Sequence, residues 1–212
     1  MAKKQAIDSK EKFQEYIENI ILSKPDFDES KKLLLEGIKK FMPDYNPTSL
    51  KSVDFDRTLI EFENWLVQTI TSEPVPSSVK SIWIGLNDNS KEEVGSFPEI
   101  QLQIRGSKFL PQNKPDDWFK NDLWDATSKN SDIKAFKTIS NTIKNFVELQ
   151  PLVLNFALIL LSIILIQNGF DIIKHEFIIY QKTIAIGCGY EAGSKYILGY
   201  LTEDGIIPPS SL

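Results

Sequence analysis

The sequence has little of several residue types on which common protein chemistries depend. Its 212 residues include one cysteine, Cys188, and one histidine, His175. A single cysteine excludes an internal disulfide framework and a multi-cysteine zinc or iron–sulfur site, and a single histidine excludes most histidine-based metal sites. The net charge of −5 provides no cationic field that would attract nucleic-acid phosphates. We therefore expect no metal or cofactor and no nucleic-acid partner.

The chain also lacks an apolar run long enough to cross a membrane comfortably. Its most apolar stretch, Leu152–Ile166, carries no charge and is shorter than the roughly 20 residues that a transmembrane helix needs. We interpret it as a helix that is apolar on all sides and buried in a folded core. The alternative is that the segment 146–170 enters a lipid bilayer. Because no apolar secretory signal follows the first lysines, we expect a cytoplasmic location.

Periodic apolar residues predict two helices at the beginning of the chain. Apolar side chains recur at helical spacing in 8–23, and the segment up to Phe41 repeats the pattern before Pro43. These helices would form an N-terminal helical hairpin. The turn-forming residues of 43–49 favour a linker, so we divide the chain into the hairpin, 1–47, and an α+β domain, 48–212.

The second part mixes helical and strand patterns. Strict alternation makes 99–105 the clearest strand, with one apolar and one polar face, as in an antiparallel sheet. Strands followed by helices and further strands indicate an α+β fold, in which an antiparallel sheet packs against helices. The expected helices are 54–71, 132–149 and 151–168, and the other expected strands are 79–86, 183–186, 196–198 and a short one within 118–125.

One stretch combines large aromatic rings with carboxylates and is our candidate binding surface. Tryptophans beside aspartates suit a protein interface, where rings anchor a partner and charges steer a basic one. In the alternative, both tryptophans cap the core of the sheet, and the carboxylates are exposed in either case. The candidate binding residues are Asp116, Asp117, Trp118, Phe119, Asp122, Trp124 and Asp125.

The sequence Asp54-Phe55-Asp56-Arg57-Thr58 matches the Asp-x-Asp-x-Thr motif of haloacid-dehalogenase-like phosphotransferases. That motif implies a magnesium-dependent phosphatase in which Asp54 is the nucleophile, and it requires a buried strand immediately before it. The preceding residues do not form an apolar strand pattern, and an amphipathic helix follows. We therefore favour a helix N-cap and retain the phosphatase as the alternative function.

Two further patterns could indicate a functional site, but each has a simpler structural interpretation. The spacing of glycines in 187–193 differs from a dinucleotide fingerprint by one residue, and a bent strand with a hairpin turn accounts for it. Cys188 and His175 could pair as nucleophile and base, but the sequence provides no third group to orient them. A buried thiol and a solvated imidazole are the simpler interpretation.

Four segments together carry a resemblance to a known group. They are Phe62-x-x-Trp65-Leu66, Val79–Leu86, Asp117-Trp118 and Ala185–Gly193. Across 54–201 the chain resembles small bacterial α+β proteins, some of which are similar to immunity proteins that neutralise a secreted toxin. The resemblance implies a protein that binds a toxin, and it assigns no catalytic residue. Because the sequence offers no convincing catalytic set and its charge balance is acidic, we expect a non-enzymatic interaction module with a basic toxin as its partner.

Overall fold

A computed structural model describes most of the chain. The described residues are 2–41, 50, 53–88, 100–113, 118–119, 123–126, 130–143, 150–175, 183–190 and 193–209. Within them the fold is α+β, as the sequence predicts. The helices are α1 (Ala2–Ser23), α2 (Phe27–Phe41), α3 (Phe55–Ser72), α4 (Lys134–Ile143), α5 (Gln150–Gly169) and the short 3-10 helix η2 (Phe170–Ile172).

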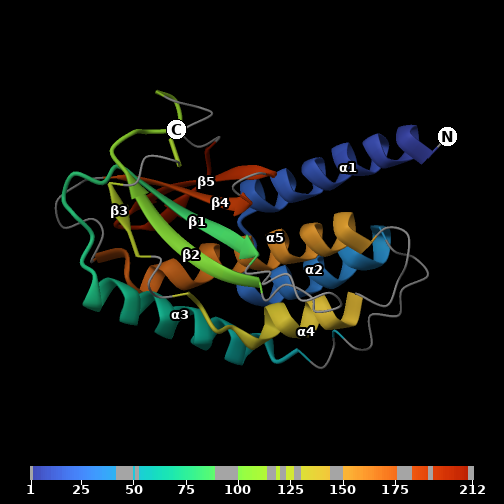
Figure 1. The fold of residues 1–212 in the computed structure, drawn as a ribbon, viewed down its shortest axis with the longest axis horizontal. Helices are drawn as coiled ribbons and strands as arrows, with labels where there is room; N and C mark the ends of the chain where they lie inside the picture. The colour runs from blue at the N-terminus through green and yellow to red at the C-terminus, as the bar shows by residue number, and fades with distance from the viewer. Residues whose placement is uncertain are drawn as a thin grey trace.

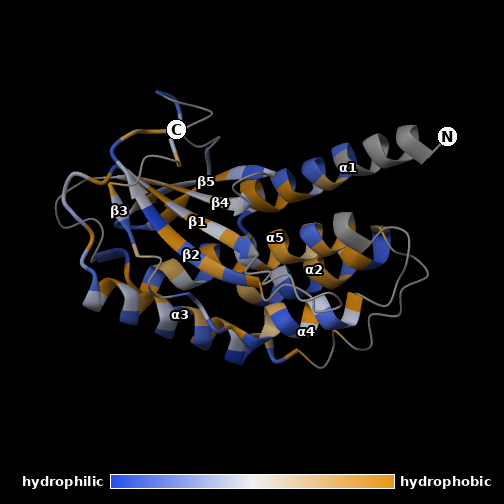
Figure 2. Ribbon diagram, viewed as in Figure 1, coloured by the Kyte–Doolittle hydropathy of each residue, from blue (hydrophilic) through white to orange (hydrophobic). Residues whose placement is uncertain are grey.

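Helix α5 is the centre of the helical layer. It packs against α1, α2, α3, α4 and strand β4, it has no charged residue, and the side seen in Figure 2 is mostly hydrophobic. A helix that is apolar on every side is stable only when neighbours cover every side. The stretch Leu152–Ile166 therefore lies within a folded core, as its composition predicts.

The apolar length of α5 also satisfies a simple criterion for membrane crossing. The segment Val153–Ile172 is the single candidate span among the described residues, and 83% of its apolar window is buried inside the protein. Lipid cannot contact those side chains without displacing the helices around them. In the folded protein, neighbouring elements therefore cover most of this segment, whereas Ile172 at its end is 57% exposed.

Six strands form one sheet in the order β3-β2-β1-β4-β5-β6. Its strands are β1 (Ser81–Asp88), β2 (Ile100–Ser107), β3 (Trp124–Asp125), β4 (Ile184–Tyr190), β5 (Lys195–Thr202) and β6 (Gly205–Ile207). The described helices lie on one side of this sheet (Figure 1).

The prediction of a purely antiparallel sheet is wrong at its centre. Strands β1 and β2 pair antiparallel, but β1 and β4 pair parallel, with Ile82 opposite Ile186. A parallel pair needs a crossover connection, and here β2, β3, α4 and α5 lie between the two strands in the chain. The sheet is therefore mixed, with its one parallel pair at the most buried position.

The first two helices share the core of the rest of the chain. Phe13 of α1 stacks on Phe156 of α5 with ring centroids 4.8 Å apart, and Phe41 of α2 meets Phe156 at 5.1 Å. The hydroxyl of Tyr16 donates a hydrogen bond to the carbonyl of Leu33 across 2.7 Å. These contacts join α1 and α2 to α5. The predicted boundary at residue 47 lies outside the described residues.

Two polar contacts, one buried and one exposed, fix helix ends. The amide Nε2 of Gln167 on α5 donates to the carbonyl of Ile21 in the last turn of α1, at 3.1 Å. The carboxylate of Glu61 on α3 accepts from the backbone N–H of Lys134, the first residue of α4, at 3.2 Å. Helix termini leave such groups without intrahelical partners, so side chains distant in sequence complete them.

Candidate functional site

The outer face of the sheet, opposite the helices, carries a small aromatic cluster. Side chains alternate along β1, so Trp83 points away from the face that holds Ile82 and Ile84. Trp118 meets Trp83 edge to face at 5.7 Å between centroids, and Phe119 lies 5.2 Å from Trp83. The three rings form a hydrophobic cluster separate from the main core.

Burial of this cluster decides between the two interpretations of Trp118. The ring is 2% exposed, and Phe119 and Trp83 are buried to a similar degree. An aromatic anchor that inserts into a partner must be accessible in the free protein. Trp118 and Phe119 therefore pack on the outer face of the sheet, in a cluster outside the main core in which the alternative interpretation places the tryptophans.

A glycine in β4 provides the space for Trp118. A Cβ atom added at Gly187 would lie 2.4 Å from Cη2 and 2.7 Å from Cζ2 of Trp118. Carbon atoms in contact prefer separations of about 3.5–4.0 Å, so a side chain at this position would displace the indole or the strand. Gly189 has a different role, because its φ of +142° favours glycine. The glycine pattern of 187–193 is structural, as the bent-strand interpretation predicts.

Trp124 lies on the other side of the sheet from Trp118. It is 8% exposed and belongs to the main core between the sheet and the helices. Its neighbour Asp125 extends the other way, with Oδ2 at 3.6 Å from Nε of Arg105. The two predicted tryptophans therefore do not form one patch, because each is held in a different cluster.

Leu123 is the exposed apolar residue that the sequence interpretation missed. Its backbone N–H donates to the carbonyl of Gly106 at 3.0 Å, which holds it beside β2, while its side chain is 37% exposed. Its position between Asp122 and Trp124 gave no periodic signal. The candidate residues Asp116, Asp117 and Asp122 lie outside the described residues.

A basic side chain borders the aromatic cluster. The ammonium of Lys195 on β5 lies over the Phe119 ring, 4.7 Å from its centroid. Such a cation–π contact stabilises an exposed site by about 0.5–1 kcal/mol. The sequence interpretation did not include Lys195, because the register that places β5 beside β4 cannot be read from spacing.

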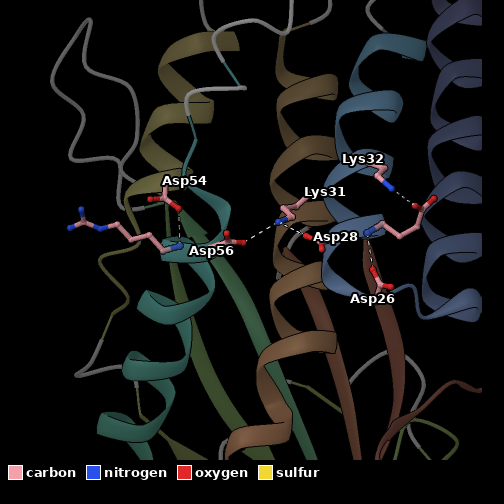
Figure 3. Close-up of polar contacts among 8 residues, drawn as sticks. Asp26, Asp28, Lys31, Lys32, Asp54 and Asp56 are labelled. Atoms are coloured by element: carbon pink, nitrogen blue, oxygen red, sulfur yellow. Dashed lines mark hydrogen bonds and ion pairs between the residues drawn. The ribbon is translucent and has the colours of Figure 1, made fainter.

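The Asp54 and Asp56 carboxylates serve the start of α3 rather than a common centre (Figure 3). Asp54 is the N-cap of α3, and its side chain accepts from the backbone N–H of Arg57 at 3.0 Å. Asp56 points away from Asp54 and pairs with Lys31 of α2 at 3.0 Å. Lys31 also contacts Asp28 at 2.6 Å, so the ammonium links α2 to α3.

This arrangement differs from the geometry that a phosphotransferase of this type needs. The motif must follow the end of a buried strand, so that both carboxylates face one metal ion. Here Val53 lies in a bend, with Leu50 in a 3-10 turn before it. Among the described residues, no group of three or more His, Cys, Asp or Glu side chains could hold a metal ion.

Cys188 and His175 occupy different environments. The thiol is fully buried on the helix-facing side of β4, and burial raises the pKa of Cys188 to about 12 despite contacts with Ser162 and Gly189. A thiol in this state provides almost no thiolate nucleophile near neutral pH. His175 is exposed, as its charged neighbours in the sequence predict.

Comparisons with protein-family models, with curated proteins and with solved structures find no match to this chain.

Proposed function

We propose that this protein is a non-enzymatic interaction module of the immunity type, which binds a basic protein partner. The observation that carries the proposal is the position of Trp118 and Phe119, which pack on the face of the sheet that no described helix covers. A rigid support of this kind lowers the entropy lost when a partner binds.

In this proposal the tryptophans and the carboxylates have different roles. The rings of Trp118 and Trp124 are buried and hold the backbone, whereas Asp116, Asp117 and Asp122 attract the partner. Leu123, with its exposed side chain, provides an apolar contact beside them. Charges of this kind mainly increase the rate of association and the specificity for a partner of opposite charge.

The positions that could support catalysis have structural roles instead. Asp54 caps a helix, Asp56 pairs with Lys31, and the Cys188 thiol is buried with a strongly raised pKa. An enzyme needs a nucleophile, an acid–base pair or a metal centre in one place. Binding through a surface needs none of these groups, so these contacts favour the interaction module over the phosphatase.

A quantitative capture experiment tests the proposal. The tagged wild-type protein and an Asp116→Asn, Asp117→Asn, Asp122→Asn variant would be incubated with extracts of the source cell, with Glu203→Gln, Asp204→Asn as the control. We expect a basic protein that both the wild type and the control retain and the triple variant loses. Equal capture by all three proteins would contradict the proposed surface.

The immunity-type relationship needs its own experiment. The captured basic protein would be expressed alone and together with the wild-type chain in a susceptible host. We expect growth arrest in the first case and normal growth in the second. A captured protein that is harmless when expressed alone would contradict the immunity role while leaving the binding surface in place.

A further inference from the structure

A groove lies between the beginning of β2 and the exposed side of α4, away from the aromatic cluster. Its volume is about 560 Å³, and Ile100, Gln101, Asp132, Lys134, Lys137 and Asn141 are among the residues that line it. Figure 1 shows the start of β2 directly beside α4. Ile100 pairs with Asp88, the last residue of β1, so the groove lies at the end of the sheet where the central strand β1 finishes.

The walls of the groove are held by contacts from both sides. Ser131 binds β2 twice, because its hydroxyl accepts from the N–H of Leu102 at 2.8 Å and its N–H donates to the carbonyl of Leu102 at 3.1 Å. Glu61 fixes the first amide of α4. These bonds fasten the segment before α4 to β2 and the first residue of α4 to α3, so the lining residues stand on backbone that is held in place, as a preformed site requires.

The charge of the groove is opposite to that of the whole chain. Lys134 and Lys137 are three residues apart, so both ammonium groups extend from the same side of α4. Within the described part of the chain, no ion pair is formed by either lysine, and Asp132 is the one carboxylate in the lining. A protein with a net charge of −5 therefore has a concave region with two ammonium groups and a single carboxylate.

We propose that this groove binds a small organic phosphate. A phosphomonoester carries about −1.5 to −2 charges at pH 7, which match the two ammonium groups, and lysine binds phosphate as a point charge. The volume falls within the roughly 300–1,000 Å³ typical of small-molecule sites, and it exceeds what a bare phosphate ion fills. Ile100 provides an apolar contact for the organic part, and the Asn141 amide can hydrogen-bond its hydroxyl groups.

The test compares three probes and two variants. Inorganic phosphate, ribose 5-phosphate and adenosine monophosphate would be titrated into the intact protein, with calorimetry for affinity and amide chemical shifts for location. The variant Lys134→Gln, Lys137→Gln removes the paired ammonium groups. The control Lys39→Gln, Lys80→Gln changes the net charge by the same amount at exposed lysines outside the groove.

We expect at least one organic phosphate to bind more tightly than inorganic phosphate, with shifts at Ile100, Gln101 and the first turn of α4. The groove variant should weaken this binding by about tenfold or more, which corresponds to about 1.4 kcal/mol, while the control stays within about twofold of the wild type. Circular dichroism would show that both variants fold. The proposal is overturned if no probe saturates, if both variants lose affinity equally, or if the shifts map to another surface.

Discussion

Replacement of Gly187 by alanine tests how the aromatic cluster is held on the sheet. The new Cβ would lie 2.4 Å from the Trp118 ring, so the indole or the strand must move by about 1 Å to restore normal carbon contact. Overpacking of this kind costs about 1–3 kcal/mol. The lower entropy of the unfolded chain with alanine offsets about 0.4–1 kcal/mol. We expect a net loss of about 1–2 kcal/mol in the free energy of unfolding.

Urea denaturation followed by circular dichroism measures this loss. A slope of about 2 kcal/mol per molar urea would convert it into a midpoint shift of about 0.5–1 M. The same substitution would be made in a Trp118→Phe background, because the smaller ring lacks the indole atoms that meet the new methyl group. There Gly187→Ala should change stability by only a few tenths of a kcal/mol.

A second background provides the matched control. Phe119 belongs to the same cluster, but its ring is not among the atoms nearest to the Cβ position of Gly187. The cost of Gly187→Ala should therefore be the same in Phe119→Leu as in the wild type. If Gly187→Ala costs the same in the Trp118→Phe background as in the wild type, within about 0.5 kcal/mol, a clash with the Trp118 ring does not explain the loss of stability.

Four further predictions concern single side chains elsewhere in the fold. Because burial raises the pKa of Cys188 to about 12, iodoacetamide at pH 8 should label the thiol only after unfolding in urea, and rapid labelling of the native protein would contradict its burial. Burial likewise raises the pKa of Tyr16 from 10.0 to about 12, so the folded state keeps this proton longer and its stabilising effect is lost as the pH rises from 10 to 12. Tyr16→Phe should reduce the fall in unfolding free energy between pH 10 and 12. If the unfolding free energies of the wild type and the variant fall equally with pH over this range, Tyr16 does not cause the fall. Glu61→Ala should lower stability by about 0.5–2 kcal/mol and speed hydrogen exchange at the amide of Lys134. An unchanged exchange rate at that amide would argue that Glu61 does not cap α4. Neither the wild type nor Asp54→Asn should hydrolyse an aryl phosphate above the background rate. Hydrolysis by the wild type that the variant loses would establish the phosphatase alternative.

The helices and several strands could be predicted from periodicity because their signals are local. Apolar spacing located α3 and alternation located β2, since each residue reports the face on which it lies, whereas an uninterrupted apolar run located α5. The parallel pairing of β1 with β4 could not be predicted in this way, because it depends on residues separated by two helices and two strands. The three-residue strand β6 has no pattern long enough to be recognised.

The candidate site shows the same division between local and long-range information. The stretch 116–125 was recognisable from its composition, but no pattern in it indicates that Trp118 and Trp124 enter different clusters. Trp83 was recognisable as a residue on the second face of its strand. Its contact with Trp118 depends on the fold, as does the role of Gly187. The spacing of Lys134 and Lys137 was present in the sequence, but the groove beside them becomes visible only when β2 is placed next to α4.

The order of elements along the chain has a consequence for synthesis on the ribosome. Helix α5 is made before β4, β5 and β6, although β4 is one of the elements that cover it. At elongation rates of about 5–20 residues per second, the most apolar helix leaves the ribosome seconds before the sheet can be completed. During this interval β1 lacks its parallel neighbour, because the pairing of Ser81 with Ala185 spans roughly a hundred residues, and such distant contacts form late. The nascent chain therefore exposes apolar side chains of α5 that β4 covers in the finished protein.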